Sequence, residues 1–194
     1  MDCRACADVS WIQRWISDVV KPAPAKTARP GNLPPTGTST SSTAPGSPGS
    51  RRIRDPLSFK PRELEKLKEM VTAWEPFVHP RAREFFPSQE TLISVLTEIA
   101  RCVHESHDPV LGGEADCVFW YGELGTGSGP AQAVIRLMKP GEASESVTFV
   151  NRVLVFIFAT DDSFEQLMKL PKEPFRTVCS DQLCINLSHI STSL

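Results

Sequence analysis

The segment from Cys117 to Leu170 constrains the fold more than any other part of the chain, because it combines three strand-like stretches with a short amphipathic helix. Residues 153–159, VLVFIFA, form a nearly unbroken apolar run, which is typical of a strand covered on both faces. Residues 131–138 alternate between apolar and more polar positions, which predicts a strand with one solvated face. We therefore expect a sheet in which residues 153–159 are central and residues 117–121 and 131–138 are the neighbouring strands.

Helical patterns flank these predicted strands. Asp161 or Asp162 is expected to cap a short helix that follows the central strand. Ser88 is expected to cap a longer helix, and an earlier helix is expected to begin at Pro61 and to end before Pro76. Strands followed by amphipathic helices predict an α/β fold, here a single domain with a mixed central sheet flanked by helices.

The chain divides into three regions by composition. Residues 1–20 have the pattern of a short amphipathic helix with Trp11 and Trp15 on its apolar face, so this helix is expected to dock on its own domain or on a partner. Residues 21–54 are dominated by Pro, Ser, Thr and Gly, which predicts a disordered linker because such a segment buries too little apolar surface to fold. Residues 55–194 are expected to form the α/β domain.

Overall charge and cysteine content exclude several classes of protein. With 21 basic and 23 acidic residues in 194, the chain has no global basic field that would favour nucleic acid. The longest apolar run is too short to span a membrane, and the first residues do not have the pattern of a signal peptide. The six cysteines form no regular framework, which predicts reduced thiols and a cytoplasmic location.

Three groups of side chains are candidates for metal binding. His104, His107 and Asp108 are expected at the C-terminal end of the Ser88 helix and would need a further ligand such as Cys102 or Cys117 to hold zinc. The other two groups are Cys3 with Cys6, and Cys179 with Cys184, whose spacing is longer than in the usual zinc knuckle. Because histidine is also favoured at helix C-termini, and because the sequence has no H-E-x-x-H motif and no pair of C-x-x-C motifs, we expect no metal and no other cofactor.

Two further patterns concern a loop and the C-terminus. The glycine-rich loop at residues 122–129 leads into a strand and lacks the Lys-Ser/Thr of a phosphate-binding loop, so a hairpin is expected there. Thr192, Ser193 and Leu194 match the pattern of tails that PDZ-type grooves bind by strand addition. Trp11, Trp15, Thr192 and Leu194 are therefore the candidate residues for binding a protein partner.

Three stretches carry a family resemblance: residues 114–122, EADCVFWYG, residues 130–137, PAQAVIRL, and residues 150–158, VNRVLVFIF. Together they resemble the cytoplasmic domain of bicarbonate transporters of the erythrocyte anion-exchanger (band 3) type, which is similar to mannitol/fructose-type phosphocarrier domains. The resemblance implies an α/β scaffold that anchors proteins, docks partners or forms a homodimer. Residues 118–125 contain no histidine to accept a phosphoryl group, and we expect no membrane domain in this chain, so the resemblance implies neither phosphoryl transfer nor transport by it.

Three hypotheses follow. The first is a non-enzymatic cytosolic interaction or regulatory domain that resembles the cytoplasmic domain of an anion transporter and binds protein partners. The second is a metal-dependent or phosphoryl-transfer enzyme that uses His104, His107 and Cys117. The third is an adaptor that acts through its N-terminal helix and its PDZ-type tail.

Overall fold

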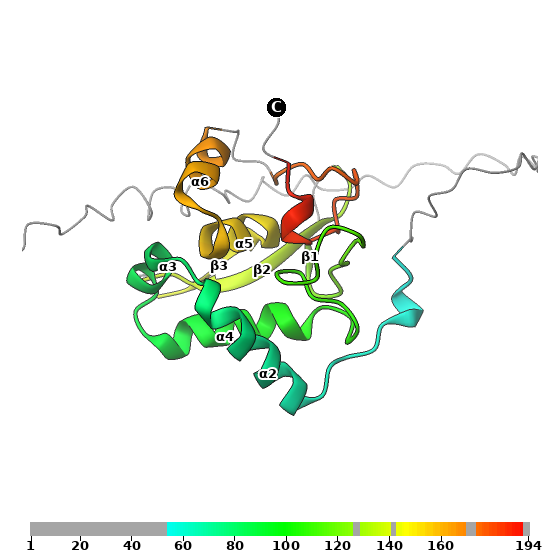
Figure 1. Cartoon of the computed structure of the whole chain (residues 1–194), viewed down its shortest axis with the longest axis horizontal. Coiled ribbons are helices and arrows are strands. Elements are labelled where there is room, and N and C mark those ends of the chain that lie inside the picture. Colours follow the sequence, from blue (N-terminus) through cyan, green and yellow to red (C-terminus); the bar gives the residue numbers. More distant parts are fainter. Residues whose placement is uncertain (1–53, 126–128, 141–142, 170–173, 192–194) are drawn as a thin grey trace, which may run out of the picture.

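The computed structural model describes residues 54–125, 129–140, 143–169 and 174–191 (Figure 1). Trp11, Trp15, Thr192 and Leu194 lie outside the described residues, as do the predicted N-terminal helix and nearly all of the predicted linker. The elements in chain order are η1 (Pro56–Ser58), α2 (Leu64–Trp74), η2 (Glu75–Phe77), α3 (Pro80–Phe85), α4 (Gln89–Arg101), β1 (Leu124–Gly125), β2 (Gln132–Met138), β3 (Glu145–Phe149), α5 (Val150–Phe158), α6 (Asp161–Met168) and η3 (Leu187–His189). Within the described ranges, none of these helices is both long and apolar enough to cross a bilayer.

The sheet has three strands in the order β1-β2-β3, and both pairs are antiparallel. β2 confirms the strand predicted at residues 131–138, and its register with β3 runs from Val134 opposite Phe149 to Met138 opposite Glu145. β1 pairs with the start of β2 across the glycine-rich segment, as expected for a hairpin. The combination of helices with a small sheet confirms the predicted fold class.

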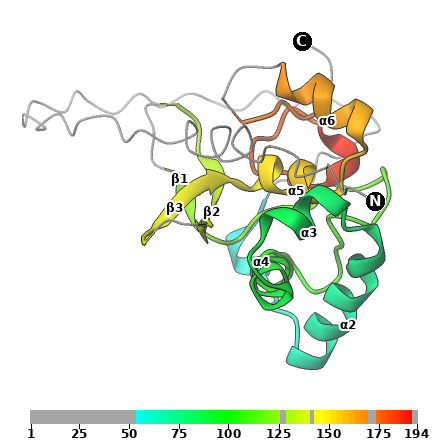
Figure 2. The same cartoon turned by 90° about the vertical axis from the view of Figure 1, so that its left-hand side faces the viewer.

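The predicted central strand at residues 153–159 is wrong, because this segment lies in helix α5. Every residue of α5 from Val150 to Ile157 is buried, including Asn151 and Arg152. A short run that is apolar on all sides has the same pattern in a buried helix as in a buried strand, so periodicity does not separate the two. The pairing of β3 with β2 ends at Phe149, and the chain turns there into a helix that lies on one side of the sheet, with α4 on the other side (Figures 1 and 2).

The strand predicted at residues 117–121 is also wrong. Phe119 forms a single antiparallel bridge with Cys184 and does not join the three-stranded sheet. The strand β3, which the sequence did not predict, takes the place beside β2 instead. Residues 117–121 thus connect the helical layer to the C-terminal segment, and this connection positions the candidate site.

Helix starts follow capping side chains. Ser88 Oγ accepts a hydrogen bond from the Thr91 backbone N–H at 3.2 Å, which confirms Ser88 as the cap of α4. The predicted cap at Asp161 or Asp162 is wrong, since Thr160 precedes α6 and its Oγ1 accepts from the Ser163 N–H at 3.5 Å. Likewise α2 begins at Leu64 and not at Pro61.

Aromatic side chains join the helices into one core. Phe85 of α3 meets Phe156 of α5 edge-on, with ring centroids 5.2 Å apart, and Phe164 of α6 contacts the same Phe156 ring. Trp74 of α2 is fully buried and donates its Nε1 hydrogen to Asp108 at 3.0 Å. The sheet, the helices and the C-terminal segment therefore share a single hydrophobic core.

Candidate metal centre

Four metal-ligating side chains converge where the loop after α4 meets the C-terminal segment. Cys117, Cys179, Cys184 and His189 each offer one ligand atom, and these four atoms all lie within 4.8 Å of one another. His189 Nδ1 is 3.4 Å from Cys184 Sγ and 3.8 Å from Cys117 Sγ. All three cysteines are free thiols.

These spacings suit tetrahedral zinc. With Zn–S near 2.3 Å and Zn–N near 2.0–2.1 Å, tetrahedral angles place a sulfur and a nitrogen ligand about 3.6 Å apart. The two measured distances of 3.4 and 3.8 Å lie on either side of that value. Three thiolates and one imidazole are also a ligand set of structural zinc sites, in which protein side chains occupy all four positions.

Two isolated backbone bridges bring the four ligands together. The bridge between Phe119 and Cys184 places Cys117 near the C-terminal segment, and the Ile185 N–H donates to the Val118 carbonyl at 2.8 Å. The bridge between Thr177 and Ile190 places Cys179 beside His189. Ligands that are far apart in sequence therefore meet through main-chain pairing.

The turn between Cys179 and Cys184 is tight. Ser180 has a φ of 59°, which lies in the left-handed region that few residues other than glycine adopt. The Asp181 side chain accepts from the Leu183 N–H at 2.9 Å, and the Asp181 carbonyl accepts from the Cys184 N–H at 3.2 Å. This turn directs both cysteine side chains toward the same point.

His189 is held with its Nδ1 toward the thiols. Its Nε2 lies 2.9 Å from the carbonyl oxygen of Glu114, an acceptor that requires the proton to be on Nε2. Nδ1 therefore carries the lone pair and faces Cys117 and Cys184. Metal-bound histidines in proteins are oriented by the same kind of hydrogen bond from the other ring nitrogen.

Asn186 braces the helix that carries His189. Its side chain accepts from the Ser188 N–H at 3.0 Å, which caps η3, and donates to the carbonyls of Gly113 and Asp116 at 2.9 and 2.8 Å. Asn186 is itself buried. It fixes the loop that precedes Cys117 against the turn that carries His189.

The surroundings of the thiols influence their ionisation in opposite directions. Burial is the main cause that raises the pKa of Cys117 to about 11, and burial also raises the pKa of Cys184. Burial acts against ionisation of Cys179 too, but hydrogen bonds from Thr177 and from the Asp181 backbone are the leading causes that outweigh it and lower the pKa of that thiol to about 7. Cys179 is therefore the thiol of this cluster that most readily supplies a thiolate to a metal.

The structure does not bring His104 and His107 to Cys117. Their rings lie 5.5 Å apart, and His104 Nδ1 is 2.8 Å from Ser106 Oγ. In the described ranges these two histidines belong to no group of three or more metal-ligating atoms. Buried Arg62 explains the conformation of this loop, because its guanidinium donates to the carbonyls of His104, Glu105 and His107 at 3.2, 2.9 and 2.7 Å.

The sequence offered Cys117 only as a candidate ligand beside His104 and His107, and did not join it to Cys179, Cys184 and His189. The available signal was the spacing C-x4-C-x4-H at the C-terminal end, in which His189 follows Cys184 by the same interval that separates the two cysteines. Comparisons with protein-family models, with curated proteins and with solved structures find no match for this chain.

Proposed function

We propose that this chain is a non-enzymatic interaction domain that binds one Zn²⁺ as a structural element, through Cys117, Cys179, Cys184 and His189. The convergence of these four ligand atoms within 4.8 Å carries the proposal. Four protein ligands complete a tetrahedral shell, which leaves no open position for substrate or water and favours a structural over a catalytic role. Such a metal contributes directly to folding free energy.

The zinc would fasten the C-terminal segment to the body of the domain. Outside the cluster, residues 174–191 are joined to the loop at residues 109–120 by the Phe119–Cys184 bridge, by main-chain hydrogen bonds such as that from the Ile185 N–H to the Val118 carbonyl, and by side chains such as Asn186. This segment has no extended strand or long helix of its own within the described residues. A metal bound by both segments would stabilise residues 174–191, which contain little regular secondary structure.

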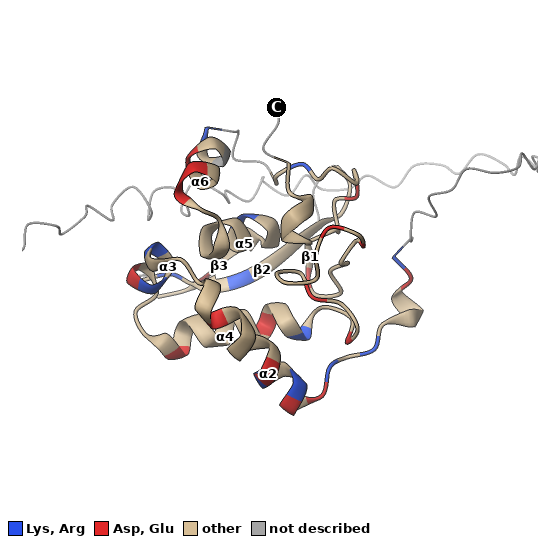
Figure 3. Cartoon of the chain, in the orientation of Figure 1, with Lys and Arg blue, Asp and Glu red and all other residues tan. Residues whose placement is uncertain are grey.

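A catalytic role for His104, His107 and Cys117 lacks support from the geometry, since among the described residues the two histidines share no group of metal-ligating atoms with Cys117. Lys and Arg are interspersed with Asp and Glu over the helices and loops, which favours a protein partner over nucleic acid (Figure 3). The adaptor role of the two chain ends, the likeness to transporter domains and the cytoplasmic location stay predictions. A reducing compartment would suit a site that needs free thiols.

Zinc content tests this function. The full chain, purified without chelators, is expected to contain one zinc per molecule by elemental analysis. Cys179→Ser and Cys184→Ser are each expected to lower that content below half. Cys102→Ser is the matched control, because Cys102 is a partly buried free cysteine outside the cluster. Full-length protein that is folded by circular dichroism and free of zinc, even after growth with added zinc, would refute the proposal.

A further inference from the structure

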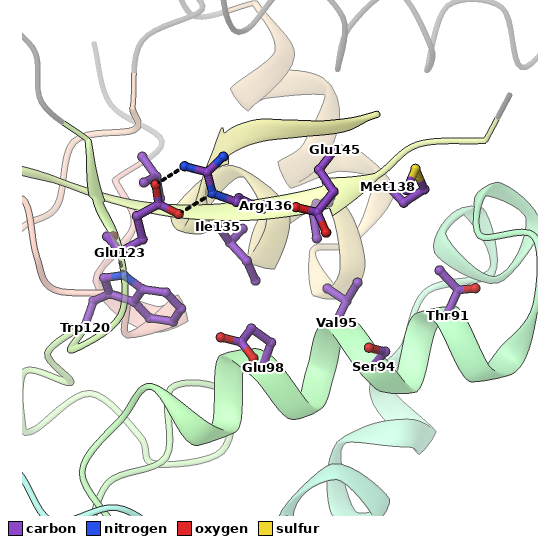
Figure 4. A pocket seen from close by; sticks show the side chains of 12 residues that line it. Thr91, Ser94, Val95, Glu98, Trp120, Glu123, Ile135, Arg136, Met138 and Glu145 are labelled. Atoms are coloured by element: carbon purple, nitrogen blue, oxygen red, sulfur yellow. Dashed lines mark hydrogen bonds and ion pairs between the residues drawn. The ribbon is translucent and has the colours of Figure 1, made fainter. Parts of the chain in front are cut away.

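A groove with a volume of about 390 Å³ separates α4 from the sheet (Figure 4). It is lined by residues of α4, by the loop that carries Trp120, by β2 and by the first residue of β3. A cavity of this size lies in the range of sites that bind small ligands or a few side chains of a peptide. It does not include any ligand of the proposed zinc site.

Part of the inner surface of the groove is apolar. Val95, Ile135 and Trp120 are buried, with exposed fractions of 7, 3 and 1%. Thr91 and Ser94 add hydroxyl groups along α4, and Figure 4 shows them facing the sheet across the groove. Such a surface suits a side chain with an apolar stem and a polar end.

Three carboxylates and one guanidinium border this apolar surface. Arg136 is fully engaged by Glu123, with Nε–Oε2 and Nη2–Oε1 distances of 2.8 and 2.5 Å, so this pair has no net charge. Glu98 pairs with Arg101, which lies outside the groove lining. Among the described residues Glu145 forms no ion pair, and it feels the charge of Arg136 only at longer range, so negative charge exceeds positive charge at this end of the groove.

The pKa of Arg136 indicates that the electrostatic potential around this side chain is negative. Its pKa is raised, first by the hydrogen bonds with Glu123 and then by the charges of Glu123 and Glu145. Carboxylates beside a low-dielectric wall attract cations more strongly than they would in open water. An anionic ligand, including a phosphate backbone, is therefore disfavoured here.

We infer that this groove binds a peptide segment of a protein partner in which a Lys or Arg stands next to an apolar residue. The cationic end lies between Glu145 and Glu98, and the aliphatic stem and the neighbouring apolar side chain cover Val95 and Ile135. The inference deepens the interaction role proposed above and rests on it, but it does not depend on zinc.

The test is a titration of the ¹⁵N-labelled full chain with a capped six-residue peptide of alternating Arg and Leu, followed by NMR. Amides of Thr91, Ser94 and Glu145 are expected to shift, and the affinity is expected to fall with added salt. The double variant Glu98→Gln/Glu145→Gln is expected to weaken binding about fivefold, in line with the loss of two exposed charge contacts. Glu69→Gln is the control, since Glu69 is an exposed carboxylate on α2 outside the groove.

Several outcomes would overturn the inference. Shifts confined to other surfaces would do so, as would an unchanged affinity in the double variant or equal binding of a Leu–Glu peptide. Displacement of the Arg–Leu peptide by a peptide of residues 10–21 of this chain would assign the groove to the protein's own N-terminal segment. Zinc is measured on the same sample, so peptide binding without zinc refutes only the metal site, and zinc without peptide binding refutes only the groove.

Discussion

At the scale of single residues, the tautomer of His189 determines which ring nitrogen can bind a metal together with the three thiols. The Glu114 carbonyl accepts a hydrogen bond from the Nε2–H, and the lone pair of Nδ1 is left to face two thiols. The imidazole is therefore oriented before any metal arrives, which lowers the entropy lost on binding. This orientation depends on neighbours that are not ligands, above all on Asn186.

The first prediction concerns Asn186→Ala. The substitution removes both hydrogen bonds to the 113–116 loop and the cap of η3, but no ligand. We expect zinc affinity to fall about 10- to 100-fold, as for other residues that orient metal ligands. Competition with a chromophoric chelator measures this. Gln182→Ala, a partly buried position in the same segment, is the control, and equal affinities of the two variants would contradict the positioning role.

The sequence pointed to one residue of the cluster as a candidate ligand, but not to the set. Cys117 was recognised because it lies near two histidines along the chain, yet its neighbours in space come from residues 179–189. The link between them is made by the Phe119–Cys184 bridge, a single main-chain pair that leaves no periodic pattern in the sequence. The histidines were misleading because Arg62, far away along the chain, holds their loop.

At the scale of elements, β2 and α5 show when the spacing of apolar residues along the sequence predicts secondary structure and when it does not. β2 alternates in sequence and was predicted within one residue. α5 is apolar throughout, and a fully buried environment removes the polar face that distinguishes a helix from a strand. Ser88 was identified as a cap because its signal is local, whereas β3 is defined by pairing with β2.

The second prediction tests the buried environment of α5. Leu154 is fully buried, so Leu154→Ala is expected to lower the free energy of unfolding by about 3 kcal/mol through lost burial and the cavity that remains. Leu57→Ala, at a position that is 95% exposed, is expected to change it by less than about 0.5 kcal/mol. Urea unfolding followed by far-UV circular dichroism gives both values. Similar values for the two variants would contradict the placement of α5 in the core.

At the scale of the whole molecule, the described residues form one core, and the cysteine cluster lies where the C-terminal segment meets the loop that precedes Cys117. Figure 2 shows α2 and α4 on the side of the molecule away from the C-terminus, and η3 beside α5. The two regions differ in what stabilises them. The helices depend mainly on apolar burial, whereas the C-terminal segment adds bridges, side-chain braces and the proposed metal to the burial of Phe175 and Ile185.

The third prediction follows from this division. Removal of zinc by a chelator is expected to increase amide hydrogen exchange at Val178, Ile185 and Ser191 at least about tenfold, because each donates a main-chain hydrogen bond next to the cluster. Leu96 and Ile99, in the buried face of α4, are expected to keep their protection. Exchange measured by NMR separates these outcomes. Equal acceleration in α4 would mean that the metal stabilises the entire domain and not this segment.

The most direct measurement of the central claim is X-ray absorption at the zinc edge of the full chain. The account predicts a shell of three sulfur atoms at about 2.3 Å and one imidazole nitrogen at about 2.0–2.1 Å. A shell dominated by oxygen, or a sulfur count that stays at three in Cys184→Ser, would contradict it.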